Sequence, residues 1–261
     1  MLKALYAALW RARWRLVEAA LSPRRNVQCR GLRFSLPADN WITHYRWQSY
    51  NTKEVETLDW IDRSFQKNDT LFDIGANIGQ YSIYAALRHP GIRILAFEPE
   101  YSNAHLLRDN VTSNGLEHQI EIYSIALSNH CGLSRLHLQD LTPGAALLTE
   151  SKGTLQMTRT NHKVIAREGI YAMTMDAFCA EIGRTPQCIK IDVDGTEVEI
   201  LEGAFNTLRL PQLRTLLIEM PDNEIRRNQC KGLLIQAGLA LDWLDSSGAS
   251  MNQIWCRSVT Q

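Results

Sequence analysis

Long apolar runs are missing from this sequence of 261 residues. No segment approaches the ~20 consecutive apolar residues that a membrane-spanning helix needs. A signal peptide is not predicted either, because the longest uncharged stretch near the N-terminus covers residues 4–10, and Arg11, Arg13 and Arg15 then interrupt it. The default expectation is a cytoplasmic protein, with peripheral contact at the inner face of a membrane left open.

Metal-binding and disulfide spacings are also missing. The six cysteines stand at positions 29, 131, 179, 188, 230 and 256. They form no Cys-x-x-Cys pair, and no histidines lie near them at zinc-ligand spacing. We therefore predict no metal site, and we expect free, buried thiols in a reducing compartment.

The net charge is zero, but it is unevenly distributed. Residues 1–33 hold eight basic residues and one acid, which gives this segment +7 and leaves −7 for the remainder. Residues 1–21 have the periodicity of an amphipathic helix, although Arg13 falls on its apolar face. Two interpretations stay open: residues 1–25 contact a membrane surface, or the helix packs on the domain or on a second subunit. The acidic remainder argues against a nucleic-acid partner.

The sequence divides into an extension, residues 1–50, and a domain, residues 51–261. In the extension, an aromatic-rich segment over residues 30–52 suggests short strands or a lid. From residue 70, strand-like runs alternate with helical segments, which indicates an α/β fold with a doubly wound, mostly parallel sheet. The predicted strands are 70–74, 93–97, 120–125, 133–138, 171–175, 188–193 and 213–219, with 239–244 and 253–257 as a closing antiparallel pair. Helices are predicted at 52–65, 79–88, 102–114, 176–182, 197–208 and 223–237, and a weakly patterned insertion at 140–169.

The first predicted parallel strand ends in the motif Asp-Ile-Gly-Ala-Asn-Ile-Gly, residues 73–79. Doubly wound sheets bind ligands at such carboxyl ends. Gly75 permits a sharp turn, Gly79 permits close packing of the next helix, and Asp73 can hold an ammonium group. A dinucleotide site uses Gly-x-Gly-x-x-Gly to approach a pyrophosphate, but Asn77 replaces the middle glycine. An acid here also repels phosphate, so the loop favours S-adenosylmethionine, which carries an amino group and no phosphate.

The second strand ends in Glu98 and Pro99, and Glu98 follows Asp73 by 25 residues. An acid at this place can accept both hydroxyls of an adenosine ribose. Pro99 directs the chain into the next helix. The simpler alternative is a solvated carboxylate on a loop.

The third strand end reads Ile-Lys-Ile-Asp-Val-Asp-Gly-x-Glu, and period-two alternation places Lys190, Asp192 and Asp194 on one face. A central parallel strand is expected to be apolar on both faces, so these charges must pair or face a cleft. Either Lys190 forms a structural ion pair with Glu219 or Asp73, or Asp192 or Asp194 acts as a general base. Asp192, Asp194 and Glu219 could also hold a divalent cation, which Lys190 would oppose.

Together these motifs resemble the FkbM family of methyltransferases. They occur in the family's order, and the similarity covers about residues 70–220. The resemblance implies a class I methyltransferase fold, Rossmann-like with seven strands, and S-adenosylmethionine as donor. It also implies O-methylation, with a hydroxyl of a sugar, glycolipid or polyketide as acceptor.

The resemblance assigns roles to the three strand ends. The predicted catalytic residues are Asp192 first, Asp194 second, and Lys190 beside them. Family members usually carry Glu where this chain has Asp194. The predicted cofactor site comprises residues of the first two strand ends: Asp73, Gly75, Ala76, Asn77, Gly79, Glu98 and Pro99.

Two other functions stay open. A nicotinamide-dependent oxidoreductase would keep Glu98 but lacks the glycine pattern. A membrane-associated binding protein without catalysis would not need Asp73, Glu98 and Asp192 together. The predicted partner is a small-molecule or glycan acceptor; neither its identity nor the oligomeric state is encoded in a recognisable pattern.

Overall fold

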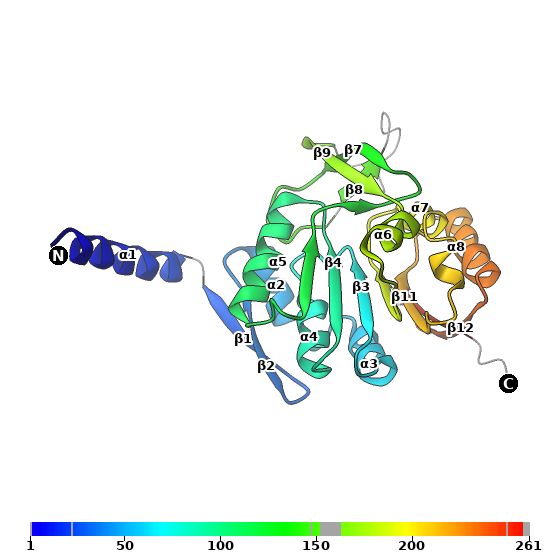
Figure 1. Ribbon diagram of the computed structural model, residues 1–261, viewed down its shortest axis with the longest axis horizontal. Coiled ribbons are helices and arrows are strands. Elements are labelled where there is room, and N and C mark those ends of the chain that lie inside the picture. Colours follow the sequence, from blue (N-terminus) through cyan, green and yellow to red (C-terminus); the bar gives the residue numbers. More distant parts are fainter. Residues whose placement is uncertain (1, 22, 147, 152–162, 249, 258–261) are drawn as a thin grey trace.

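The computed structural model describes residues 2–21, 23–146, 148–151, 163–248 and 250–257. Its centre is a seven-stranded sheet in the order β12-β13-β11-β10-β3-β4-β5 (Figure 1). β13 pairs antiparallel with both of its neighbours, whereas the pairings from β11 to β5 are parallel. The predicted seven-stranded, mostly parallel sheet is confirmed. Its strands are β3 (Thr70–Ile74), β4 (Arg93–Phe97), β5 (Ile120–Tyr123), β10 (Cys188–Ile191), β11 (Thr215–Glu219), β12 (Leu239–Leu244) and β13 (Asn252–Arg257).

Helices cover both faces of the sheet, which explains why its central strands are apolar on both sides. In β3, Leu71 packs into one hydrophobic core and Phe72 into the other. The first core includes side chains of α3 (Val55–Ser64), α4 (Gln80–Arg88) and α5 (Tyr101–Ser113). The second includes side chains of α6 (Met175–Ile182), α7 (Glu197–Glu202) and α8 (Glu224–Gln236).

Several boundaries differ from the sequence-based prediction. β5 and β10 each end two residues early, at Tyr123 and Ile191. α3 does not begin at Thr52, because Glu54 adopts a left-handed conformation with φ 54° and the helix starts after it. The helix predicted over 197–208 ends at Glu202, and a 3₁₀ turn over Thr207–Arg209 follows.

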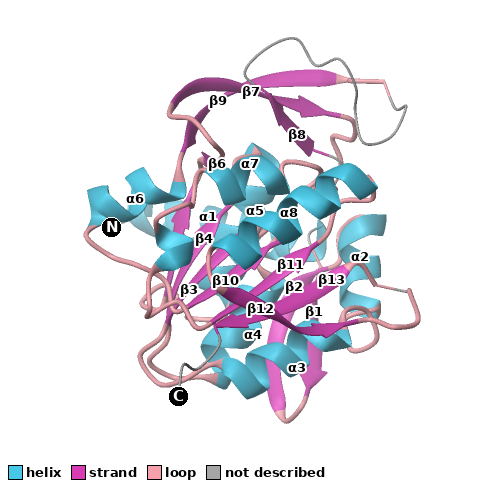
Figure 2. Ribbon diagram, turned by 90° about the vertical axis from the view of Figure 1, so that its right-hand side faces the viewer, coloured by secondary structure: helices cyan, strands magenta, loops and turns pink. Residues whose placement is uncertain are grey.

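A second sheet crosses the end of the main one (Figure 2). It contains β6 (Ala126–Leu127), β9 (Ala166–Met173), β7 (Gly132–Leu138) and β8 (Leu148–Ser151), in that spatial order. The weakly patterned insertion at 140–169 is therefore partly ordered as strands, since β8 and the start of β9 both pair with β7. These pairings join residues distant in sequence, which local periodicity does not reveal. Residues 147 and 152–162 of the insertion lie outside the described part.

The N-terminal residues form a helix and a hairpin. α1 (Leu2–Leu21) agrees with the helix predicted over 1–21 and extends away from the sheet (Figure 1). β1 (Arg24–Cys29) and β2 (Leu32–Pro37) form an antiparallel pair that contributes side chains to the first core. The expectation of short strands or a lid missed α2 (Trp41–Gln48), whose N-terminus is fixed by a capping box between Asn40 and Thr43.

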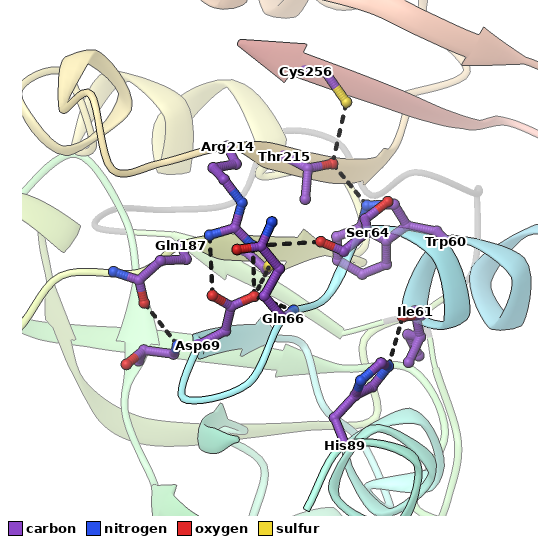
Figure 3. A network of polar contacts seen from close by, with 12 residues as sticks. Trp60, Ile61, Ser64, Gln66, Asp69, His89, Gln187, Arg214, Thr215 and Cys256 are labelled. Carbon is purple, nitrogen blue, oxygen red and sulfur yellow. Dashed lines mark hydrogen bonds and ion pairs between the residues drawn. The ribbon is translucent and has the colours of Figure 1, made fainter. Parts of the chain in front are cut away.

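The amino ends of the central strands are joined by a polar network (Figure 3). Asp69 accepts hydrogen bonds from both terminal nitrogens of Arg214, at 3.0 and 2.6 Å, and from the backbone N–H of Gln66. The Gln187 side chain accepts from the N–H of Thr70 at 2.7 Å. These bonds tie the entry points of β3, β10 and β11 together, at the end of the sheet opposite to its carboxyl edge.

Candidate functional site

A cavity of about 1070 Å³ opens at the carboxyl ends of β3, β4, β10 and β11. Its lining also includes residues of α3 and of the β12–β13 pair, among them Trp60, Trp243 and Ile254. Such a volume is at the upper end of the range for small-molecule sites, so it can hold two ligands side by side. Of the predicted site residues, the cavity is lined by Gly75, Ala76, Asn77, Glu98, Pro99, Lys190, Asp192 and Asp194.

The loop after β3 is shaped by residues with positive φ. Gly75 has φ 77°, and a Cβ built on it would lie 2.0 Å from the carbonyl oxygen of Asp192. Position 75 therefore requires glycine for two reasons: the positive φ of the turn, and the close approach of the Asp192 backbone. Asn77 has φ 51°, and its side chain donates to the carbonyl of Ala145 at 2.8 Å. Gly79 does not line the cavity; a Cβ there would meet Leu107, which agrees with its predicted packing role.

Glu98 lies at the end of β4 with 3% of its surface exposed. Its carboxylate accepts the backbone N–H of Asn77 at 2.8 Å and that of Glu100 at 3.0 Å. Burial raises the pKa of Glu98 to about 7, and the two backbone hydrogen bonds only partly oppose this shift. Each carboxylate oxygen keeps a further lone pair, so Glu98 can accept two ligand hydroxyls while it holds the loop.

Lys190 and Asp192 form an ion pair of 2.6 Å at the end of β10. Lys190 is buried and lies 5.1 Å from the centre of the Tyr81 ring, whereas Asp192 keeps 31% of its side chain exposed. The sequence left open an ion pair between Lys190 and an acid of another strand, Glu219 or Asp73; in the structure Lys190 pairs with Asp192, two residues along its own chain segment. Asp192 also shares a hydrogen bond with Glu219 of β11.

Asp73 is placed differently from its expected position. It is buried, accepts the hydroxyl of Ser82 at 2.5 Å, and is not among the cavity-lining residues. Its Oδ1 makes no hydrogen bond with a described residue. Burial raises the pKa of Asp73, although the charge of Lys190 opposes this. The contribution of Asp73 to the site is therefore electrostatic and passes through Lys190.

The charges of this cluster determine its protonation. Burial alone would lower the pKa of Lys190, but the carboxylates of Asp192, Asp73 and Glu54 outweigh burial and raise it. Burial alone would raise the pKa of Asp192, but Lys190 and the hydrogen bond from Glu219 hold it well below its usual range. Asp192 is therefore an anion at neutral pH, directed into the cavity beside a permanent cation.

Sequence reasoning missed the opposite wall of the cavity. Its residues come from α2, from the segment before α3, from α4 and from the start of β13: Arg46, Lys53, Glu54, Tyr81 and Asn252. The left-handed conformation of Glu54 has no clear sequence signal, since the residue is neither Gly nor Asn. Glu219 was recognised only as a partner for Lys190 or as a metal ligand, yet it is an acid at a strand end like Glu98 and lines the same cavity.

S-adenosylmethionine fits the chemistry of these residues. Glu98 offers acceptors for a ribose, Gly75–Asn77 offer backbone beside it, and Asp192 adds a second carboxylate for a cationic ligand. A pyrophosphate would meet both carboxylates and would be repelled. Within the described residues, no three His, Cys, Asp or Glu side chains are grouped as metal ligands.

The chain is similar to known methyltransferases. The model of the methyltransferase FkbM domain matches residues 73–248. The 31-O-demethyl-FK506 methyltransferase FkbM of Streptomyces tacrolimicus is 25% identical over 59% of this chain, which spans 66% of that protein. Methyltransferase sdnD of Sordaria araneosa is 27% identical over 71% of this chain and 80% of its own. The structure of Aeropyrum pernix fibrillarin with natively bound S-adenosyl-L-methionine aligns with a TM-score of 0.49 at 12% identity, covering 90% of this chain and 83% of that one.

Proposed function

The chain belongs to the FkbM family of S-adenosylmethionine-dependent methyltransferases, and we propose that it methylates a hydroxyl oxygen of a sugar, glycolipid or related small molecule. The observation that carries this proposal is the shared cavity of Glu98 and Asp192. One carboxylate suits the ribose of the donor, and the other stands beside a fixed cation where an acceptor can reach it. The cavity extends to residues of α3 and β13, and its volume of about 1070 Å³ leaves room for an acceptor that extends beyond its reacting group.

When bound, S-adenosylmethionine supplies a methyl group already activated by its sulfonium. The residues of this chain then have to position the acceptor and remove its proton. Asp192 accepts the hydrogen bond of the acceptor hydroxyl through its exposed carboxylate. The hydroxyl becomes strongly acidic as its oxygen gains the new bond, so even a carboxylate of low pKa can take the proton.

Lys190 and Asp194 support this step in different ways. Lys190 holds Asp192 in one orientation and in its ionised form, because its buried ammonium pairs with Asp192 and is kept charged by Asp192 and Asp73. Asp194 also lines the cavity and is the second candidate base. A hydrogen bond from Glu219 also lowers the pKa of Asp192 and so favours its ionised form.

Donor binding is tested by calorimetry with the full chain. S-adenosylmethionine and S-adenosylhomocysteine should bind, and NAD should not. Glu98→Ala should weaken donor binding, whereas Glu181→Gln, an exposed carboxylate on α6, should leave it unchanged. Tight binding of NAD without binding of the sulfonium nucleoside would favour the oxidoreductase alternative.

The acceptor is identified by incubating the protein with methyl-labelled donor and fractionated cell extract. Label in a sugar or glycolipid fraction, located on oxygen by mass spectrometry, is the expected result. Label on nitrogen or carbon would refute O-methylation while leaving methyl transfer intact. A protein that binds the donor and labels no fraction would support the alternative without catalysis.

A further inference from the structure

Helix α1 exposes an unusual amount of apolar surface. Tyr6, Leu9, Leu16 and Leu21 are each more than 60% exposed, and Trp10 is 55% exposed. Figure 1 shows the helix projecting from the hairpin, away from the sheet and its covering helices. Aliphatic and aromatic side chains gathered on one exposed helix mark a surface that binds something, since isolated helices gain little stability in water.

The charge of this segment selects the partner. Residues 1–25 contain six basic residues and one acid, a net charge of +5. Arg11 and Arg13 are exposed on α1 between the apolar residues. A second copy of the chain would present the same positive charge, so association of two α1 helices brings like charges together. An anionic lipid surface, in contrast, attracts every one of these basic residues, so each of them strengthens binding.

The position of the aromatic residues fits a lipid interface. Trp10 and Trp14 lie one turn apart and contact each other edge to face, with ring centroids 6.0 Å apart. Tryptophan and arginine are the side chains that amphipathic helices place at the boundary between headgroups and acyl chains. None of the helices described in this structure has the length and hydropathy that a membrane crossing requires. An α1 bound to lipid therefore lies in the plane of the surface.

We propose that α1 attaches the protein peripherally to membranes that contain anionic lipid. The apolar side chains of α1 enter the interface, and the basic residues of positions 1–25 contact the headgroups. The rest of the chain carries −5, so the same surface attracts the arm and repels the body. None of the described residues among positions 1–25 lines the carboxyl-edge cavity, so we expect donor binding not to depend on attachment.

The test is co-sedimentation of the full chain with vesicles of phosphatidylcholine alone and of phosphatidylcholine mixed with phosphatidylglycerol. The protein should bind the mixed vesicles and release them as salt is raised. The double variant Arg11→Gln with Arg13→Gln should weaken binding on the order of 30-fold, since each basic residue near an anionic surface contributes about 1 kcal/mol, or about fivefold. Trp10→Ala with Trp14→Ala should weaken it at least about tenfold.

Matched controls lie outside α1. Trp41→Ala removes a tryptophan that is 71% exposed on α2, and Arg108→Gln removes an exposed arginine on α5; both should bind vesicles like the unmodified chain. Donor calorimetry on each variant checks that the body is folded, and it separates failure of this proposal from failure of the methyltransferase assignment. Equal vesicle binding by the α1 variants and the unmodified chain would overturn the proposal. A second outcome would also overturn it: the unmodified chain sediments as a dimer and binds no vesicles, and the variant Trp10→Ala with Trp14→Ala sediments as a monomer.

Discussion

The substitution Glu98→Gln tests the electrostatics of the buried carboxylate at the end of β4. Glu98 is buried and its pKa is raised to about 7 from 4.5, because burial penalises its charged form. A carboxyl group whose pKa is higher in the folded state stabilises that state at acidic pH, and this stabilisation is lost as the pH rises through about 7. Glutamine has nearly the same shape and does not titrate, so it removes this pH dependence.

The magnitude follows from the two pKa values. With 4.5 unfolded and about 7 folded, the contribution of Glu98 to the free energy of unfolding should fall by about 2.5 kcal/mol between pH 5 and pH 8. The stability of Glu98→Gln relative to the unmodified protein should therefore rise by this amount over the same range. Its absolute level should be offset by about 1 kcal/mol, since glutamine has one oxygen for the two N–H groups of Asn77 and Glu100.

Urea denaturation of both proteins at a series of pH values, without ligand, measures this difference. Other titrating groups are shared, so they cancel when the two curves are subtracted. Donor affinity gives a second measurement. In the unmodified protein it should increase from pH 6 to pH 8, because ionised Glu98 accepts hydrogen bonds from hydroxyls better than the protonated form. In the variant it should be weak and independent of pH. Parallel stability curves would show that Glu98 does not titrate as the buried geometry requires.

Three further substitutions test other parts of the structure. Asp192→Asn should slow methyl transfer by about 10²–10⁴-fold with donor affinity little changed; full turnover at saturating donor and acceptor would exclude its role as base. Gly75→Ala should lower the melting temperature far more than Gly115→Ala. Both glycines have positive φ, but only a Cβ at position 75 would meet the backbone of Asp192. Similar shifts for the two variants would contradict this close contact. Arg214→Ala should lower the free energy of unfolding in urea by roughly 2–3 kcal/mol. This is less than for a fully buried ion pair, because a third of the Arg214 side chain is exposed. A loss under ~0.5 kcal/mol would mean that the contact with Asp69 is not stabilising.

The sheet could be predicted from sequence because its signals are local. Each central strand is a short apolar run that ends in a polar residue, and helices on both faces make that pattern obligatory. The predicted strand 70–74 matches β3 at both ends. In the second sheet, the predicted strands 133–138 and 171–175 overlap β7 and β9. The sheet that they form and β8 were not predicted, since these strands are held by pairings between distant residues. α2 was also missed, because its eight residues are rich in aromatic side chains that also favour strands.

Some residues of the candidate site could likewise be predicted from local sequence, and others could not. Glu98 and Asp192 were found because an acid at the end of an apolar strand is costly unless a ligand or a partner uses it. Asp73 satisfies the same pattern, yet its side chain is buried beside Ser82 and Lys190, which the one-dimensional pattern cannot distinguish from a position facing the cavity. The wall that contains Glu54 depends on how a segment before a helix folds over the strand ends. If the donor is held at the strand ends as proposed, substitutions in the covering segments, such as Glu54→Gln, should change the preferred acceptor while donor affinity stays constant.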